Sequence, residues 1–303
     1  MARARVEIGK IHRRVLGWFD EHGRSFPWRA HRDPYQTLVA ELMLQQTQTA
    51  RVAPVYVEFL KRFPTVERLA RAPAMEVIQA WKGLGYNRRA VDLQRAAQTI
   101  LHEYGGEVPD DPGRLRKLPG VGEYSASAVA CFAYDVQTPV IDVNVTRVLS
   151  RAALGRDDGD VRVVAEGWLP AGSAYHWNQA LMDIGATLCR NDKPLCPACP
   201  MKSTCAFYAK GKHKQARVRT EPKQPKFEGS ARQKRGSIID RLRVAAGDGI
   251  SLGALGKAIH PEGADRDLSW LVELLEGLER DGLATMSPSA RRGVARGTVR
   301  LPR

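Results

Sequence analysis

The sequence predicts an all-α protein of more than one domain, and three observations support this. Apolar residues recur every three or four positions in successive segments up to about residue 205, as they do in amphipathic helices. Glycine and proline separate these segments, and few stretches alternate as strands do. A chain of 303 residues is also long enough for two or three domains, each with its own core.

The helical segments follow one another along the first two thirds of the chain. The clearest are residues 52–63, 75–85, 88–105 and 165–189. The composition then changes between Lys210 and Lys226, where seven Lys or Arg residues accompany one Glu and two prolines. We therefore expect a basic linker over residues 210–229, either as a solvated spacer or with added contacts to phosphates.

Residues 230–303 have a different pattern. Isoleucine and leucine spacing predicts three short helices, and the basic end of the chain predicts a two-stranded hairpin around Gly293 and Gly297. Three helices and a hairpin resemble a winged helix. Such a module either binds DNA or packs on the preceding domain, and the sequence leaves both interpretations open.

Charge indicates the kind of partner. The net charge of +14 and the pI near 9.8 favour a polyanion, with counterion release from its phosphates. No apolar run approaches the length of a membrane span, and the N-terminus has no hydrophobic signal core. We expect a cytoplasmic, nucleoid-associated protein with no membrane partner.

Four of the five cysteines lie within seventeen residues, in the pattern C-x6-C-x2-C-x5-C. They are Cys189, Cys196, Cys199 and Cys205. In a reducing compartment this spacing indicates a metal site before disulfides. Four thiolates are the ligands of a [4Fe–4S] cluster, whereas zinc usually takes two close Cys pairs and only one is present. Zinc is therefore the weaker alternative, and Cys131 is expected to be a buried apolar residue.

The segment LPGVGEYSASA (residues 118–128) places Gly120 and Gly122 just before an expected helix. Bare backbone amides and the positive end of a helix dipole can approach an anion closely. A plain helix–helix turn is the alternative.

Several motifs together resemble a known family. LPGVG, PVIDVNVTRVLSR (residues 139–151) and the four cysteines occur in the order found in helix-hairpin-helix DNA glycosylases with an iron–sulfur cluster, the superfamily of endonuclease III. FPWR, ELMLQQTQ, WKGLGY and NQALMDIGATLC are similar to motifs of MutY-type adenine DNA glycosylases. The resemblance covers residues 8–210.

This resemblance implies a particular architecture. A six-helix barrel with the helix-hairpin-helix would occupy residues 33–141, and an iron–sulfur cluster domain would comprise residues 1–32 and 142–209. A monomer would bind double-stranded DNA that contains a mismatched or damaged base.

Two carboxylates are candidates for the chemistry. Removing a base leaves positive charge on the sugar, so an anion and a proton donor can divide the work. Glu41 lies in an apolar helical stretch, where desolvation would raise its pKa and keep it protonated. Asp142 stands at an expected helix start, where amide donors favour an ionised carboxylate. The residues alone favour a structural buried acid at Glu41 and a simple N-cap at Asp142, whereas the resemblance makes Glu41 the proton donor and Asp142 the stabiliser of the oxocarbenium ion or its adduct.

The resemblance also assigns roles to Asn144 and Tyr124. Asn144 would form hydrogen bonds within the site. Tyr124 stands where bifunctional relatives carry the lysine that attacks the sugar, and a phenol cannot form that Schiff base. We therefore predict a monofunctional enzyme without strong strand-cleaving activity. A Tyr124 that only packs in the core is the alternative.

The remaining site residues follow from the same motifs, because the target base must leave the stack. Trp28, Arg29 and Gln179 would line the adenine pocket, and Gln46 and Tyr86 would enter the duplex beside the opposite base. Trp28 as a core residue and Tyr86 as a helix-end plug are the alternatives. WKGLGY and LPGVG would hold phosphates.

Three features depart from the family pattern. The roughly 75 residues after the linker do not resemble the longer C-terminal domain that inspects 8-oxoguanine in well-known members. Asn87 replaces a second aromatic residue, and Val143 stands where glycine is frequent. We predict a base excision repair glycosylase for adenine opposite 8-oxoguanine or guanine. A thymine, uracil or 5-hydroxyuracil mismatch glycosylase is the first alternative, and a non-catalytic iron–sulfur DNA-binding or redox-sensing protein is the second.

Overall fold

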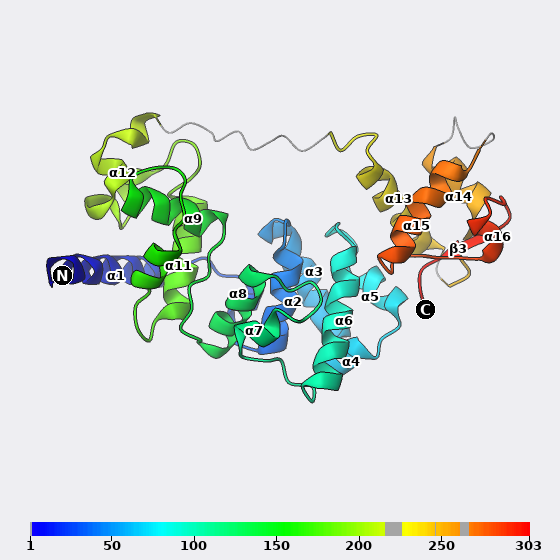
Figure 1. Cartoon of the computed structure of the whole chain (residues 1–303), viewed down its shortest axis with the longest axis horizontal. Coiled ribbons are helices and arrows are strands. Elements are labelled where there is room, and N and C mark those ends of the chain that lie inside the picture. Colours follow the sequence, from blue (N-terminus) through cyan, green and yellow to red (C-terminus); the bar gives the residue numbers. More distant parts are fainter. Residues whose placement is uncertain (1, 216–225, 246, 261–266) are drawn as a thin grey trace. The chain divides into compact units, whose positions relative to one another are not determined.

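The computed structural model describes residues 2–215, 226–245, 247–260 and 267–303 (Figure 1). Its secondary structure is almost entirely helical, so the predicted fold class is confirmed. The chain divides into two compact units. The first unit comprises residues 1–38, 109–117 and 121–222, and the second comprises residues 39–108, 118–120 and 223–303. No helix in the described ranges has the length and apolar character needed to cross a bilayer.

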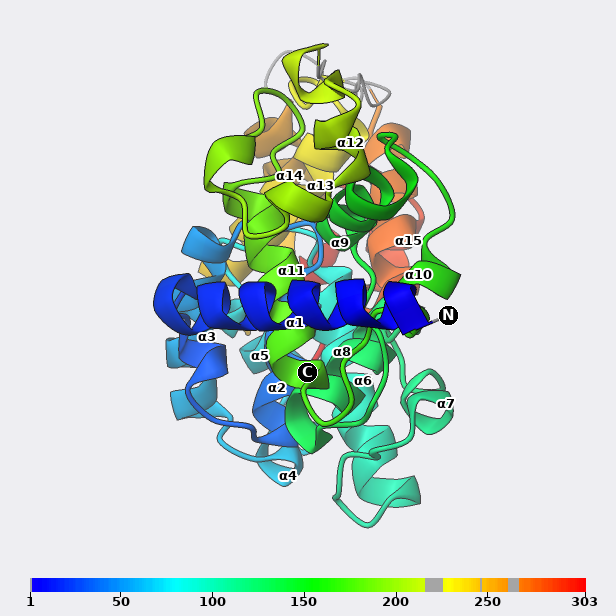
Figure 2. The same cartoon turned by 90° about the vertical axis from the view of Figure 1, so that its left-hand side faces the viewer.

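The first unit is built around α11 (Ala174–Thr187), which lies against α1 (Ala2–His22) and α9 (Val143–Leu149) (Figure 2). α8 (Glu123–Tyr134) contributes Cys131 to the same apolar core, where its side chain is fully buried, as predicted. The remaining elements are short: η1 (Pro27–Arg29), α7 (Pro112–Leu115), η2 (Ser150–Leu154), α10 (Arg162–Gly167), η3 (Cys196–Ala198), η4 (Lys202–Thr204), α12 (Ala206–Ala209) and η5 (Lys212–Gln215).

The second unit begins within α2 (Pro34–Leu44) and continues through α3 (Thr49–Arg62), α4 (Val66–Ala70), α5 (Ala74–Ala80) and α6 (Arg88–Glu103). α4 and α5 pack on α6, the longest of these helices. The buried amide of Gln94 on α6 donates to the Ala72 carbonyl at 2.6 Å and so ties α6 to the α4–α5 connection. These helices carry two loops. The Gln46 loop, residues 45–48, joins α2 to α3, and the Tyr86 loop, residues 81–87, joins α5 to α6.

The C-terminal module (residues 230–303) completes the second unit. Its elements are α13 (Ala231–Val244), β1 (Ile250–Ser251), α14 (Leu252–Ile259), α15 (Ser269–Arg280), β2 (Thr285–Met286), α16 (Pro288–Arg291) and β3 (Thr298–Arg300). The strands form an antiparallel sheet in the order β1-β3-β2, with Ile250 and Met286 both opposite Val299. Three helices with this sheet have the winged-helix arrangement that the sequence predicts.

The predicted hairpin at the end of the chain needs a correction. β2 and β3 do pair, but α16 lies between them and β1 adds a third strand on the far side of β3. The strand β1 has only two residues, too few to produce an alternating pattern that would predict it.

The LPGVG turn requires glycine at one of its two glycine positions. Gly120 has a φ of 77°, and a Cβ there would lie 2.9 Å from Cβ of Asp92. Its carbonyl accepts a hydrogen bond from Nε2 of Gln45 at 3.0 Å. Gly122 has an ordinary φ of −87° and open space around it, as the N-cap of α8. Gly120 therefore shapes the turn, and Gly122 leaves the start of α8 uncovered.

Residues 216–225 of the predicted linker lie outside the described residues. The division of the chain at residues 32, 141, 209 and 229 stays a prediction.

Candidate active site

Asp142 is the N-cap of α9, as its sequence context predicts. Its Oδ1 accepts a hydrogen bond from the Val145 amide at 2.7 Å, and its Oδ2 accepts one from Nδ2 of Asn144 at 3.0 Å. The two donors fix the orientation of the carboxylate. The structure thus brings together Asp142 and Asn144, two of the predicted site residues.

The segment that leads to Asp142 is tied to α11 by Asn178. Oδ1 of Asn178 accepts from the Val140 amide at 2.9 Å, and its Nδ2 donates to the carbonyls of Thr138 and Ala174. Asn178 is 1% exposed, so these bonds compete little with water. The backbone before Asp142 is therefore fixed as firmly as the helix after it.

Arg147 connects α9 to the end of α11 and to the first cysteine of the cluster motif. Its Nη2 donates to Oδ1 of Asn144 at 2.8 Å and to the Gly185 carbonyl at 2.7 Å, and its Nε donates to the Cys189 carbonyl at 2.8 Å. Burial lowers the pKa of Arg147. The helices approach closely here, since a Cβ on Gly185 would lie 2.6 Å from Cβ of Asn144. The position of Asn144 thus depends on the loop that carries the cysteines.

The four cysteines of the motif line one small cavity of about 20 Å³. Arg151 shares it, with Nη1 3.7 Å from Sγ of Cys189 and hydrogen bonds to the carbonyls of Arg190 and Asn191. Burial raises the pKa of Cys199 to about 12, so ionising this thiol requires a strong positive partner. Among the described residues, no group of three or more His, Cys, Asp or Glu is arranged to hold a single metal ion.

The FPWR motif forms a short 3-10 turn that is anchored by Asp183 of α11. The Asp183 carboxylate has no exposed surface and accepts from the backbone amide and Nε of Arg24 and from Nη1 and Nη2 of Arg29, all within 3.0 Å. These bonds and charges hold the pKa of Asp183 below its usual value despite burial. Arg29, predicted to line the base pocket, is thus engaged in a buried ion pair.

The other two residues predicted for the base pocket lie in the same unit. Trp28 is half-buried and stacks on Phe26, with ring centroids 4.9 Å apart and planes 9° from parallel. Gln179 is 6% exposed and lies one turn before Asp183 on α11. Trp28 is therefore a stacked, accessible ring rather than a fully buried core residue.

Glu41 and Tyr124 have the burial that the sequence suggests. Glu41 lies on α2 in the second unit and is 5% exposed. Tyr124 is the second residue of α8 in the first unit, where its ring packs against the apolar core. Packing is thus part of the role of Tyr124.

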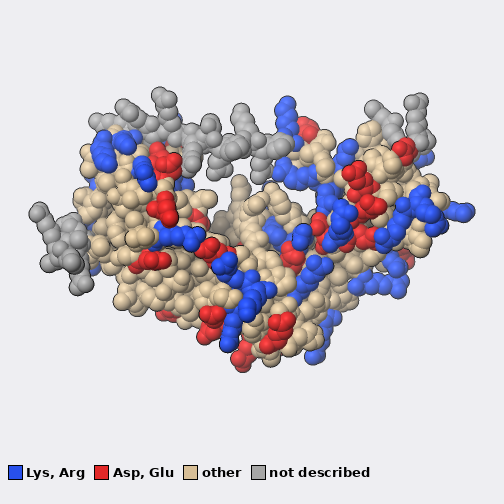
Figure 3. Space-filling view, viewed as in Figure 1, with Lys and Arg blue, Asp and Glu red and all other residues tan. Residues whose placement is uncertain are grey.

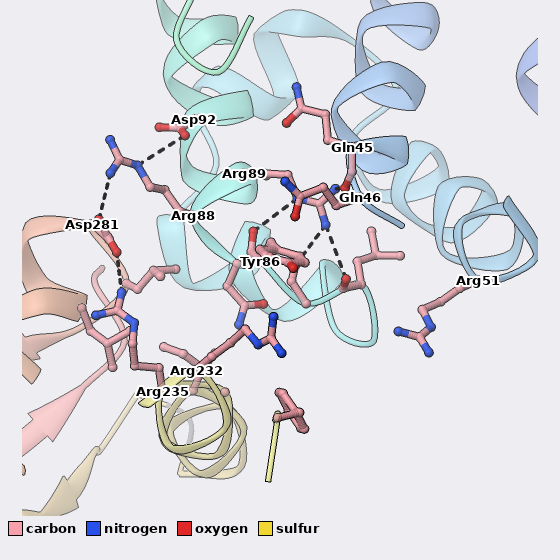
Figure 4. Close-up of a pocket in the computed structure, with 18 residues that line it drawn as sticks. Gln45, Gln46, Arg51, Tyr86, Arg88, Arg89, Asp92, Arg232, Arg235 and Asp281 are labelled. Atoms are coloured by element: carbon pink, nitrogen blue, oxygen red, sulfur yellow. Dashed lines mark hydrogen bonds and ion pairs between the residues drawn. The ribbon is translucent and has the colours of Figure 1, made fainter. Parts of the chain in front are cut away.

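Gln46 and Tyr86 line a common pocket of about 820 Å³ in the second unit (Figure 4). Both have left-handed backbones, with φ of 54° and 43° respectively. A residue other than glycine holds this conformation at a cost, and it persists only where the surroundings fix it. Two strained residues on one pocket mark it as a functional surface.

Arg89 holds the loop that carries Gln46 and the loop that carries Tyr86 (Figure 4). Its buried guanidinium donates to the carbonyls of Leu42, Met43 and Gln45 at 2.5–2.9 Å and to Oγ1 of Thr47 at 3.0 Å. The same group reaches the Gly85 carbonyl at 3.2 Å and the Tyr86 carbonyl at 3.4 Å. Burial lowers the pKa of Arg89 to about 10. One side chain therefore fastens the Gln46 loop to the Tyr86 loop.

Basic side chains are also present on the surface. Figure 3 shows Lys and Arg gathered over the C-terminal module, with Asp and Glu among them. The pocket itself is lined by Arg51, Arg88, Arg89, Arg232 and Arg235 together with Asp92 and Asp281. This is a surface of mixed but mainly positive charge, as phosphate binding requires.

The sequence did not single out Arg89, Asp183, Arg147 or Asn178. Arg89 follows another arginine at the start of a helix, and only its burial distinguishes the two. Asp183 and Asn178 lie inside NQALMDIGATLC, which was noted for its resemblance to a family motif. Polar residues within an apolar helical stretch are the signal that could have identified both.

We expect Asp183→Asn to lower the free energy of unfolding by about 3 kcal/mol, because the fully buried partner of two partly buried arginines, Arg24 and Arg29, loses its charge. Glu58→Gln, which removes an exposed pair with Lys61, should cost less than about 1 kcal/mol. The lowered pKa means that Asp183 stabilises the fold above about pH 4, and that this stabilisation is lost as the pH falls through the folded-state pKa. In denaturant titrations from pH 7 to pH 3, the difference in unfolding free energy between the unaltered protein and Asp183→Asn should become smaller as the pH falls. Equal stability of these two proteins at pH 7 would contradict the role of Asp183.

Comparisons with known proteins identify the family. Residues 39–169 match the model of the HhH-GPD superfamily base excision DNA repair protein. The adenine DNA glycosylase of Mycolicibacterium smegmatis is 40% identical over 235 residues, which are 76% of this chain and 79% of that protein. The adenine DNA glycosylase of Mycobacterium tuberculosis is 38% identical over 292 residues, or 91% of each chain.

A solved structure agrees with these sequence matches. The structure of a thermostable thymine-DNA glycosylase superposes with a TM-score of 0.65 at 31% identity, covering 68% of this chain and 99% of that one. The resemblance drawn from the motifs is thus confirmed. The chain belongs to the adenine DNA glycosylase family within the HhH-GPD superfamily of base excision DNA repair proteins.

Proposed function

We propose that this glycosylase removes adenine from a mismatch in double-stranded DNA and leaves an abasic site. The observation that carries the proposal is the Asp142 carboxylate, held through both oxygens at the start of α9. Departure of the base leaves a cationic sugar, and a pre-oriented carboxylate stabilises that charge without having to reorganise. Asn144 acts by orienting Asp142.

Glu41 serves as the proton donor to the leaving adenine. Its 5% exposure supports this role, because burial disfavours the charged form of a carboxyl group. A neutral acid and an anion would divide the reaction between two carboxyl groups in different surroundings.

The displaced adenine is held by Trp28 and Gln179. Trp28 offers an accessible ring face, and an amide such as Gln179 matches the adjacent donor and acceptor of adenine. Arg29, paired with Asp183, holds the turn that carries Trp28 and so contributes to the pocket through position.

The opposite base, 8-oxoguanine or guanine, is contacted by Gln46 and Tyr86. Their strained backbones and their common pocket support this role. Gly120 and Gly122 present backbone amides to a phosphate of the DNA, and the open space at Gly122 favours a close approach. Tyr124 replaces the lysine of bifunctional enzymes, so the reaction ends at the abasic site.

A [4Fe–4S] cluster is bound by Cys189, Cys196, Cys199 and Cys205. The cavity they share contains four thiols and the cationic Arg151, a donor set that fits an iron–sulfur cluster better than zinc. When bound, the cluster would crosslink this loop. Arg147, which bonds both the Cys189 carbonyl and Oδ1 of Asn144, would then hold Asn144 in place relative to the loop.

A second candidate is removal of thymine or uracil from a mismatch. The superposition on a thymine-DNA glycosylase favours it, because closely related pockets can be retuned by few substitutions. The two carboxyl groups disfavour a non-catalytic DNA-binding or redox-sensing protein.

The substrate can be tested with duplexes that contain A, T, U or 5-hydroxyuracil opposite G, 8-oxoguanine and the normal partners. We expect release of adenine opposite 8-oxoguanine and guanine, with strand cleavage only after alkali, because Tyr124 cannot form a Schiff base. Release of pyrimidines alone would favour the second candidate. Cleavage before alkali would contradict a monofunctional enzyme.

The cofactor can be tested by metal analysis of protein purified without air. We expect about four irons per chain and the brown absorbance of a cluster, both lost in Cys199→Ser. Cys131→Ala is the matched control and should keep its iron, because Cys131 lies in the apolar core. A colourless protein that contains zinc and no iron would overturn the assignment.

A further inference from the structure

The C-terminal module shares its apolar core with the helices that carry the Tyr86 loop. Ile78 of α5 and Val91 of α6 are 1% and 6% exposed, and they belong to the same buried cluster as Ile239, Leu242 and Leu278 of the module. The module is therefore packed against the scaffold of the loop. Apolar contact provides affinity but does not specify a conformation, so the polar contacts at this interface are informative.

Arg243 of α13 makes the most specific of these contacts. Its side chain is 7% exposed, and its Nε and Nη2 donate to the Ile78 carbonyl at 3.2 and 2.9 Å. Nη2 also donates to Oδ1 of Asn87 at 2.9 Å. Asn87 directly follows Tyr86 in the chain.

Asn87 is used in an unusual way. It is the N-cap residue of α6, a position where asparagine normally accepts a hydrogen bond from its own helix. Here the side chain makes no such capping bond and its oxygen accepts from Arg243 instead. The asparagine that replaces an aromatic residue of the family pattern thus supplies the acceptor for the module.

The next residue is held by the module as well (Figure 4). Nη1 of Arg88 lies 3.1 Å from Oδ1 of Asp281, and Arg235 of α13 pairs with the other oxygen of the same carboxylate. Arg88 also approaches Asp92 at 3.5 Å on its own helix. The two residues after Tyr86 therefore both contact the module, Asn87 through a partly buried hydrogen bond and Arg88 through an ion pair of a side chain that is 62% exposed.

Tyr86 needs such fixation. It is 44% exposed, its φ is 43°, and apart from the module its loop is held by Arg89 and by Nε1 of Trp81, which donates to the Gly85 carbonyl at 3.2 Å. An exposed residue with a left-handed backbone relaxes unless its neighbours prevent it.

We propose that the C-terminal module is a positioning element for Tyr86. Arg243, acting through Asn87, and Asp281, acting through Arg88, hold residues 84–88 in the conformation in which Tyr86 enters the duplex beside the opposite base. The module thereby sets opposite-base selectivity without touching the base that is removed. This inference rests on the proposed function of Tyr86.

The test uses the full chain with Asn87→Ala, Arg243→Ala, the double variant and Tyr86→Ala. Arg241→Ala is the matched control, because Arg241 is an exposed arginine on the same helix and its loss changes the charge equally. The readout is the ratio of single-turnover adenine excision opposite 8-oxoguanine to that opposite guanine. This ratio cancels differences in the folded fraction, so general destabilisation does not move it.

We expect Asn87→Ala and Arg243→Ala each to lower the ratio about tenfold, the double variant no further, and Arg241→Ala not at all. Arg243→Lys, which keeps the charge and one donor, should recover part of the loss. A ratio for Arg243→Ala equal to that of Arg241→Ala, or additive losses in the double variant, would overturn the inference while the effect of Tyr86→Ala upholds the role of Tyr86. An unchanged ratio in Tyr86→Ala would overturn both.

Discussion

The first unit depends on one constraint, the fixed orientation of the Asp142 carboxylate. Its two hydrogen bonds are local, but the chain on either side of Asp142 is held by residues from other helices and loops. Asn178 holds the preceding backbone through the Val140 amide, and Arg147 holds Asn144 while bonding the Gly185 and Cys189 carbonyls. In the proposed reaction, a carboxylate that is already oriented is effective because nothing has to move when positive charge forms on the sugar. The cysteine loop is thus connected to the Asp142 carboxylate through α9.

In the second unit, buried side chains hold the two loops that carry the strained residues Gln46 and Tyr86. Arg89 does this from the inside with bonds to backbone carbonyls of both loops, and Arg243 does it from the outside through Asn87. Both are guanidinium groups shielded from water, where a hydrogen bond to a carbonyl competes little with solvent. Asp183 has the corresponding role in the first unit, as a buried carboxylate that receives two arginines. Buried charge in this protein is therefore used to define loop geometry.

The helical fold and part of the candidate site could be predicted from the sequence, because they depend on local features of the chain. Helical periodicity, the N-cap at Asp142 and the burial of Cys131 and Glu41 all depend on neighbours within a few residues. The roles of Arg89 and Asp183 depend on partners 40 to 160 residues away, and no local pattern reports such contacts. For the same reason the ion pair between Arg29 and Asp183 was not predicted.

The central claim is that the charge of Asp142 drives base removal, and Asp142→Asn tests it most directly. Asparagine is as good an N-cap as aspartate, so the bond from the Val145 amide and the start of α9 should be kept, while the charge and the bond from Nδ2 of Asn144 are lost. Single-turnover excision of adenine should fall at least about a hundredfold, while the loss of one hydrogen bond costs only about 1 kcal/mol of stability and the affinity for the mismatched duplex is kept. Excision at the rate of the unaltered protein would contradict the account.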